Sequence, residues 1–219
     1  MARWDPGAQE RLTEAALDLY LERGYDNVTV ADIAERAGLT RRSYFRYFAD
    51  KREVLFPSAE RLPEIVGEAV LAADPAAAPL AAVLDALHQV GAQVAEHVDH
   101  ANAARRRAVI DTSAELQERE RSKSAAVAVA IDEALRQRGT GPGTAALVAQ
   151  VGSVVLGLAF RRWVKSDAAG FSAGLYAVVD DLRASLDDAG TTAHLDPAGT
   201  PPPEGPRRRG CAPCSPPRE

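Results

Sequence analysis

The sequence predicts an all-α protein, and three observations lead to this fold class. Apolar residues recur at steps of three and four along most of the chain, as they do on one face of a helix. The sequence lacks the strict alternation of apolar and polar residues that marks a half-buried strand. Its composition is that of a globular protein, with 46 % hydrophobic and 26 % charged residues among 219. We therefore expect one large helical domain, or a small domain joined to a larger one.

Capping residues delimit the first two expected helices. Asp5 followed by Pro6 is a typical helix start, because aspartate can accept hydrogen bonds from the free amides and proline tolerates the first turn. Gly24 is the expected end of this helix. The second helix should open at Thr29, where Asp32 adds negative charge near the positive helix end.

Two further short helices are expected before residue 57. Thr40 can cap a third helix formed by the stretch RRSYFRYF. Tyr44 and Phe48 are four residues apart, so they should share the inward face of that helix. Asp50 and Glu53 form the next cap pair, which predicts a fourth helix that begins in KREVLF.

The remainder of the chain is expected to form longer helices followed by a tail. Alanine, leucine and valine dominate from about residue 57, and prolines mark the breaks between helices over roughly residues 60–72, 79–98, 101–113, 115–138, 143–166 and 172–188. Beyond residue 188 the sequence is rich in proline and glycine, which predicts disorder. The predicted organisation is a first domain at residues 1–56, a helical domain at 57–188 and a tail at 189–219.

A basic segment stands out in a chain whose formal net charge is −5. Between Arg36 and Arg52 the chain carries six basic residues and one acidic residue, Asp50, so this segment has a charge of +5. Two short helices joined by a glycine turn are typical of a helix-turn-helix, whose second helix lies in the DNA major groove. Because the rest of the chain is net negative, any contact with nucleic acid should be confined to this local patch.

The third helix carries side chains that can read DNA. Arginine can bond a guanine edge with two hydrogen bonds, serine can reach a base or a phosphate, and an aromatic ring can contact a thymine methyl group. The candidate residues are Arg41, Arg42, Ser43 and Phe45, with Tyr47 and Lys51 expected at the level of the phosphates. An internal helix hairpin with a solvated charged face is the alternative, but it would not require aromatic residues on the exposed side as well.

The stretch NVTVADIAERAGLTRRSYFRYFADKREVLF resembles the N-terminal DNA-binding domain of TetR/AcrR-type transcriptional regulators. The likeness covers roughly residues 9–56 and consists of several fixed positions at fixed spacing. It implies a homodimer that represses transcription from a palindromic double-stranded operator until a small-molecule effector binds the larger helical domain. The sequence identifies neither the effector nor the operator, nor does it separate repression from activation.

The resemblance also implies roles for individual residues. Thr29 and Lys51 would hold phosphates from helix ends, whereas Arg41, Arg42 and Ser43 would probe bases. The remaining two matched positions, Phe45 and Tyr47, would hold the sugar-phosphate backbone. A tyrosine often occupies the position of Phe45 in the family, so a hydroxyl contact to phosphate is lost here.

Two helices are expected to form the dimer interface as a four-helix bundle between subunits. The first has an apolar stripe widened by neighbouring valines, with small residues that permit close approach, and the second has a similar stripe. The residues are Leu147, Val151, Val154 and Leu158 with Gly152, Ser153 and Gly157 on the first helix, and Leu175, Val179, Leu182 and Leu186 on the second. The alternative is that both are ordinary core helices of a monomer.

The effector site has no sequence signature beyond residue chemistry. Phe160, Trp163, Arg107 and Asp111 are candidates on that ground alone. A metal held by His97 and His100 is a weaker hypothesis than polar residues at a helix end. We expect no metal, no cofactor and no catalysis, because motifs for nucleophilic, metal-dependent or dinucleotide-dependent enzymes do not occur in the sequence.

Other features bear on the setting of the protein. A run of 18 or more apolar residues and a secretory signal are both missing from the sequence, so we expect a cytoplasmic protein that does not enter a membrane. Cys211 and Cys214 are interpreted as reduced thiols of the tail, whose role the sequence does not indicate. The competing function is that of a helical protein that binds a small molecule or a partner but does not bind DNA.

Overall fold

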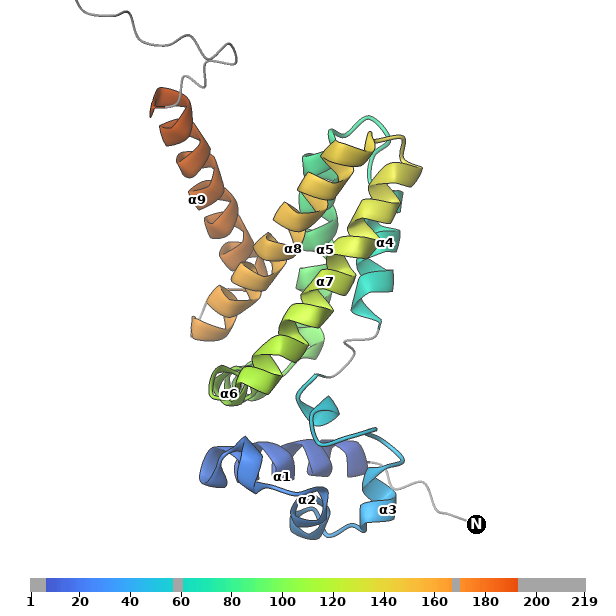
Figure 1. Cartoon of the computed structure of the whole chain (residues 1–219), viewed down its shortest axis with the longest axis vertical. Helices are drawn as coiled ribbons and strands as arrows, with labels where there is room; N and C mark the ends of the chain where they lie inside the picture. Colours follow the sequence, from blue (N-terminus) through green and yellow to red (C-terminus); the bar gives the residue numbers. More distant parts are fainter. Residues whose placement is uncertain (1–6, 57–60, 167–169, 193–219) are drawn as a thin grey trace, which may run out of the picture. The chain divides into compact units, whose positions relative to one another are not determined.

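The computed structural model describes residues 7–56, 61–166 and 170–192, and these ranges hold helices and connecting segments without a strand (Figure 1). This confirms the predicted all-α class. The chain divides into two compact units, residues 1–182 and 183–219, and the description below concerns the first unit unless residues of the second are named. Residues 189–192 of the predicted tail at 189–219 instead continue α9 (Phe171–Thr192), so the expected disorder is wrong for them. The rest of the predicted tail, 193–219, and the predicted Asp5-Pro6 helix start lie outside the described residues.

The N-terminal part, here called the head, consists of short helices with local caps. They are α1 (Ala8–Arg23), the 3-10 helix η1 (Tyr25–Asn27), α2 (Val30–Arg36), α3 (Arg41–Tyr44) and the 3-10 helix η2 (Glu53–Leu55). Thr29 caps α2 as predicted, and the cap is a reciprocal capping box. The Thr29 hydroxyl accepts from the Asp32 amide, while the Asp32 carboxylate accepts from the Thr29 amide. Gly24 ends α1 at a φ of 81°, in a region that favours glycine.

Two of the predicted helices are shorter in the structure than the sequence indicates. The α-helical part of RRSYFRYF is a single turn, α3, after which the chain bends and brings the Phe48 ring to 5.3 Å from the Tyr44 ring. The predicted fourth helix is only the 3-10 turn η2. Asp50 does cap it, accepting hydrogen bonds from the amides of Arg52 and Glu53. Phe56 has left the helical region, as expected for a residue that precedes a proline.

The helical domain contains the six expected long helices. They are α4 (Leu62–Ala72), α5 (Pro79–His97), α6 (His100–Asp111), α7 (Ala114–Gln137), α8 (Pro142–Lys165) and α9 (Phe171–Thr192). Their bounds agree with the predicted ones to within two residues, except that α9 extends to Thr192. In the bundle, α4 packs on α5 and α7, and α8 packs on the same two helices (Figure 1).

Two hydrophobic clusters form the interior of the first unit. The larger cluster joins α4, α5, α7, α8 and the start of α9 through residues such as Val66, Leu87 and Ile131. The smaller cluster holds the head together around Leu12, Ile33 and Tyr44, but it also includes residues from α6 and α7. The head and the helical domain therefore share part of a hydrophobic core.

The predicted dimer stripes are only partly available for a second subunit. On α9, Leu175 and Val179 are buried in the larger cluster of their own chain, so the prediction that they face a partner is wrong. On α8, Gly152 and Ser153 also make contacts inside the chain: a Cβ at Gly152 would meet Val83, and Ser153 donates to the Ser124 carbonyl. Apolar residues at helical spacing occur both on faces buried in a core and on faces buried in a dimer interface. The spacing therefore could not show which of the two this face is.

Part of α8 nevertheless presents an apolar face. Leu147, Val154 and Leu158 remain 67 %, 59 % and 45 % exposed. By length and composition α8 is the one helix among the described residues that could cross a membrane, a test that a core helix of a soluble protein also passes. Since the opposite side of α8 packs on α5 and α7, the exposed stripe is better explained as a surface that another protein covers.

Gly91 permits the contact that fastens the start of α9 to α5. A Cβ at this position would lie 1.9 Å from Cε1 of the buried Phe171 ring. We expect Gly91→Ala to lower the free energy of unfolding by about 1–3 kcal/mol, because the ring must shift within a packed core. Urea denaturation followed by circular dichroism measures this change.

The matched control is Gly143→Ala on α8, where the new Cβ meets no atom within 4 Å. This variant should change the stability by no more than about 0.5 kcal/mol. Equal stability of the two variants would show that the Phe171 contact does not constrain Gly91.

Candidate nucleic-acid interface

The helices α2 and α3 form a helix-turn-helix whose turn depends on a glycine. Gly38 adopts a φ of 68°, and its amide donates to the carbonyl of Glu35, which closes the end of α2. The next residue, Leu39, donates to the carbonyl of Ala34. Thr40 then caps α3 by accepting from the amide of Ser43 at 3.1 Å. The turn thus places α3 immediately after α2 with both ends capped.

Burial divides the residues of α3 and the following turn into two sets. Tyr44 is fully buried and Phe48 is 7 % exposed, and both belong to the hydrophobic cluster of the head, as predicted. The outward set consists of Arg41, Arg42 and Phe45 on one turn, together with Arg46 just beyond it. Phe45 is 50 % exposed, which is unusual for a phenylalanine without a partner.

The basic residues of this segment differ in whether their charge is neutralised within the protein. Arg36 forms an ion pair with Glu22, and Arg52 pairs with Asp50 and Glu115. Arg41, Arg42 and Arg46 form no ion pair with any residue of the described ranges. Lys51 likewise forms no ion pair in the described ranges, so four cations of the segment are not neutralised by an acidic group. They are the Lys51 ammonium and three guanidinium groups, called open here, which lie on α3 or the turn that follows.

Two of these open guanidinium groups lie over aromatic rings. The guanidinium carbon of Arg41 is 6.0 Å from the centre of the Phe45 ring, and that of Arg46 is 5.7 Å from the Tyr47 ring. Such cation-π contacts restrain a long side chain without consuming its hydrogen-bond donors. Arg46 was not among the site residues predicted individually, although it was counted in the charge of the segment.

Two of the hydroxyl residues predicted to touch DNA already have partners. The Thr29 hydroxyl lies 2.6 Å from the Asp32 carboxylate, in the capping box of α2. The Ser43 hydroxyl lies 3.0 Å from that of Thr40 at the start of α3. Both side chains are at helix starts, where amides favour an anion, but any phosphate contact must form in addition to these bonds. Tyr47 is the third hydroxyl residue predicted to touch DNA, and its ring lies under the guanidinium of Arg46.

Lys51 is tied to the protein more firmly than the sequence indicated. Its ammonium donates to the carbonyls of Tyr25 and Val28 at 3.0 and 3.2 Å, and it lies 4.1 Å from the centre of the Tyr25 ring. Val28 immediately precedes the N-cap of α2. Lys51 therefore fixes the junction between η1 and α2, whatever contact it makes with a phosphate.

Buried tyrosines hold the segment that follows α3. The Tyr20 hydroxyl donates to the carbonyl of Lys51 at 2.6 Å, and the Tyr44 hydroxyl donates to that of Asp50 at 3.0 Å. Burial is the main cause that raises the pKa of both tyrosines, with nearby acidic groups adding to it. Both hydroxyls are therefore neutral donors at physiological pH, and they anchor the chain on either side of the aromatic core.

The head contacts the helical domain through apolar and charged residues. Val109 and Ile110 at the end of α6 and Leu116 at the start of α7 are buried in the hydrophobic cluster of the head. Around them, Arg105 pairs with Asp18 and Arg119 pairs with Glu53. The predicted boundary at residue 56 therefore separates the helices along the chain but not the packed core.

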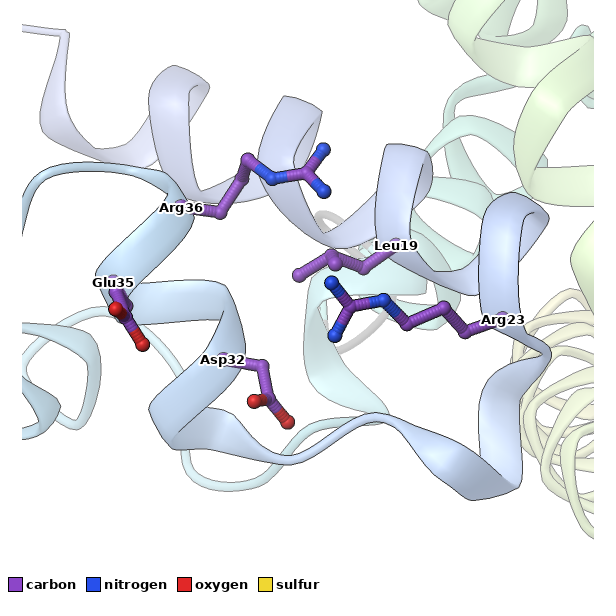
Figure 2. A pocket seen from close by; sticks show the side chains of 5 residues that line it. All are labelled: Leu19, Arg23, Asp32, Glu35 and Arg36. Carbon is purple, nitrogen blue, oxygen red and sulfur yellow. The ribbon is translucent and has the colours of Figure 1, made fainter.

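A surface depression between α1 and α2 is too polar for an apolar effector. It is lined by Leu19, Arg23, Asp32, Glu35 and Arg36, and Figure 2 shows four charged side chains around one leucine. Small-molecule sites are mostly apolar with a few polar groups. We do not assign an effector site to this depression.

The side chains considered for an effector have structural partners. Arg107 is buried and donates to Asp111 and Glu120, and Glu120 also accepts from Arg161. This network holds the pKa of Asp111 below its usual value, mainly through the hydrogen bond from Arg107. The other two candidates, Phe160 and Trp163, have ring centres 5.3 Å apart beside the larger cluster.

The histidines considered for a metal bond to the backbone instead. His97 lies 2.7 Å from the carbonyl of Gln93, and His100 lies 2.9 Å from the carbonyl of Trp163. Among the described residues, histidine, cysteine and acidic side chains do not gather into a group of three suited to a metal ion.

The glycine turn, the buried aromatic core and the open arginines are the features of a helix-turn-helix DNA-binding domain. Residues 12–56 match the family model described as Bacterial regulatory proteins, tetR family. The head is therefore similar to the N-terminal domain of that family, as the sequence resemblance indicated.

Two relatives in sequence support this assignment. YdeS, an uncharacterized HTH-type transcriptional regulator of Bacillus subtilis (strain 168), is 38 % identical over 64 residues, which cover 27 % of this chain and 32 % of YdeS. TcmR, an HTH-type transcriptional regulator of Streptomyces glaucescens, is 38 % identical over 56 residues, which cover 26 % of this chain and 25 % of TcmR. The chain thus matches about a third or less of the length of these relatives.

Solved structures extend the likeness in fold beyond the head. A Syntrophomonas wolfei protein assigned to the TetR family of transcriptional regulators matches with a TM-score of 0.52 at 16 % identity, over 86 % of this chain and 97 % of that one. NalD of Pseudomonas aeruginosa, the secondary repressor of the MexAB-OprM multidrug efflux pump, matches with a TM-score of 0.51 at 15 % identity, over 81 % of this chain and 94 % of NalD. At these identities the structures share the fold of both domains.

Lys51 provides a test of how the head is held together. Lys51→Met removes two hydrogen bonds to carbonyls that stay half-buried, so we expect the free energy of unfolding to fall by about 1–3 kcal/mol. Thermal and urea denaturation measure the loss. Arg46→Met is the control, because Arg46 is exposed and should change stability by no more than about 0.5 kcal/mol. A Lys51 variant as stable as this control would place the ammonium outside the structural network.

Proposed function

We propose that the protein is a ligand-responsive, sequence-specific DNA-binding regulator that represses transcription from a palindromic operator. The observation that carries this proposal is the set of three open arginines and one exposed phenylalanine on a short helix whose opposite side is buried. An exposed phenylalanine ring does little to stabilise the fold when this surface faces water. In a DNA groove, the arginines can bond to bases and phosphates and the ring can contact a thymine methyl group. A small-molecule effector would release the operator.

The residues of α3 divide the work of DNA recognition. Arg41 and Arg42 reach guanine edges, and Phe45 contacts a thymine methyl group or the sugar backbone. Arg46 and Tyr47 contact the sugar-phosphate backbone beside them. The amide ends of α2 and α3, together with Thr29, Ser43 and Lys51, add phosphate contacts that set the register of the head on the duplex.

A homodimer supplies the second head that a palindrome requires. The exposed apolar stripe of α8, formed by Leu147, Val154 and Leu158, supports an interface with the same stripe of a second copy. On α9, Tyr176 is exposed and extends the available apolar surface. Leu175 and Val179 are buried in the hydrophobic cluster of their own chain and do not contribute to this interface.

The effector acts by shifting a population of dimers. The dimer has two states, one whose heads fit the operator and one whose heads are too far apart or wrongly turned to fit it. A ligand that binds the second state more tightly lowers the affinity for the operator by the difference between its affinities for the two states. Val109, Ile110 and Leu116 link the head core to α6 and α7, so a change in these helices alters the placement of the head. The protein works on DNA in the cytoplasm, without a metal or an enzymatic step.

The DNA-reading role is tested with duplexes selected from genomic fragments. On the selected sequence, Arg41→Ala and Arg42→Ala should each weaken binding by about 1–3 kcal/mol and relax the base preference. Arg36→Ala is the matched control, because Arg36 is paired with Glu22 and should leave the preference intact. Fluorescence anisotropy at several salt concentrations gives the affinities. Equal losses on selected and random duplexes would refute base reading by these arginines.

The dimer is tested by placing charge on the exposed stripe. Leu147→Glu combined with Val154→Glu should convert a dimer into a monomer at micromolar concentration, since two buried carboxylates per subunit oppose association. Val129→Glu on α7 is the control, because Val129 is 57 % exposed but lies on another helix. Sedimentation velocity reports the mass. A wild-type chain that sediments as a monomer would contradict the proposed interface.

A further inference from the structure

Three consecutive arginines on α6 have different environments. Arg105 donates to Asp18 on α1 and to Asn102 on its own helix. Arg107 is buried and donates to Asp111 and Glu120. Arg106 forms neither a hydrogen bond nor an ion pair within the described ranges 7–56, 61–166 and 170–192. Of the three guanidinium groups, only that of Arg106 therefore lacks an acceptor in the described part of the chain.

Arg106 is partly withdrawn from water and has no acceptor among the described residues. Its side chain is half-buried, and of its guanidinium nitrogens Nε alone is fully buried without a hydrogen-bond partner. Burial lowers the pKa of the guanidinium, and only the more distant charge of Asp99 opposes this effect. The Asp99 carboxylate is itself used as the N-cap of α6, accepting from the amide of Asn102 at 2.7 Å. A half-buried guanidinium without an acceptor in the described ranges is a suitable partner for an anion from outside the chain.

The position of Arg106 on α6 connects it to both hydrophobic clusters. Three residues before it, Ala103 is buried in the larger cluster of the helical domain. Three and four residues after it, Val109 and Ile110 are buried in the cluster of the head. Residues at these spacings are neighbours on a helix surface. Arg106 therefore sits where α6 passes from one core to the other.

We propose that Arg106 is the anchor for an anionic group, a carboxylate or a phosphate, on the small molecule that regulates this protein. The inference rests on the proposed function and specifies the chemistry of its effector. A guanidinium matches a carboxylate or phosphate with two parallel hydrogen bonds, and a neutral ligand would leave the buried charge unpaired. Because the anchor is next to Val109 and Ile110, a bound anion acts on the residues that hold the head.

The first test asks whether Arg106 has an acceptor in the full-length protein without ligand. Arg106→Met should melt at the same temperature as the wild type or higher, because an apolar side chain of similar shape replaces an unpaired buried cation. Arg107→Met is the matched control and should melt several degrees lower, since it removes the hydrogen-bond donor of Asp111 and leaves Glu120 with Arg161 alone. An Arg106 variant that is destabilised as much as the Arg107 variant overturns the proposal.

The second test measures anion binding through the melting temperature. Sodium octanoate and inorganic phosphate serve as separate probes at constant ionic strength, with octanol as the neutral analogue. At least one of the two anions should raise the melting temperature of the wild type, and octanol should not. Arg106→Gln should weaken the apparent affinity by about tenfold or more, the order expected for losing a charge-assisted pair, while Arg106→Lys retains part of it. A wild type that responds to neither anion, or a Gln variant that responds like the wild type, overturns the proposal.

Operator binding separates this inference from the proposed function. Fluorescence anisotropy with selected duplexes should show that ligand-free Arg106→Gln binds like the wild type but no longer releases DNA when the active anion is added. Release that is unchanged in the variant argues against Arg106 as the anchor. If neither protein binds any duplex while anion binding persists in the wild type alone, the regulator function fails and the anchor stands.

Discussion

The burial of Tyr44 is the interaction on which the recognition surface depends. An α-helix of four residues has no stability of its own, because nucleation costs more than its few hydrogen bonds return. Packing of the Tyr44 ring against Phe48 and the core of the head stabilises this helix, which its own sequence propensity does not. The tyrosine hydroxyl also bonds the Asp50 carbonyl, which fixes the chain beyond the helix. Because the Tyr44 face of α3 is held in the core, the opposite face can expose two arginines and a phenylalanine. These exposed side chains do not stabilise the fold themselves.

Charge in the head is divided between structure and recognition. Arg36 and Arg52 form ion pairs, and Lys51 donates hydrogen bonds to carbonyl groups. These contacts hold α1, η1 and η2 in place. The three guanidinium groups that remain open belong to one short segment, residues 41–46. Net charge along the sequence cannot show this division, since it depends on which acidic groups the fold brings within reach.

The sequence predicted local features well because they depend on neighbouring residues. The capping box of Thr29 and Asp32 and the glycine end of α1 involve residues at most four apart, and both are present. The apolar stripe of α9 was misassigned because periodicity reveals an apolar face but not what covers it. The partners of Lys51 lie more than 20 residues away in the chain, so the sequence could suggest its charge but not its structural role. Open and paired arginines could not be separated for the same reason.

The shared core of the head also constrains how this protein can be recombined with its relatives. Val109, Ile110 and Leu116 complete the interior of a head to which they do not belong in sequence. A chimera that joins residues 1–56 to the effector domain of another regulator would present this head with foreign side chains at three buried positions. Exchange of such heads between regulators therefore requires that the end of α6 and the start of α7 travel with the head.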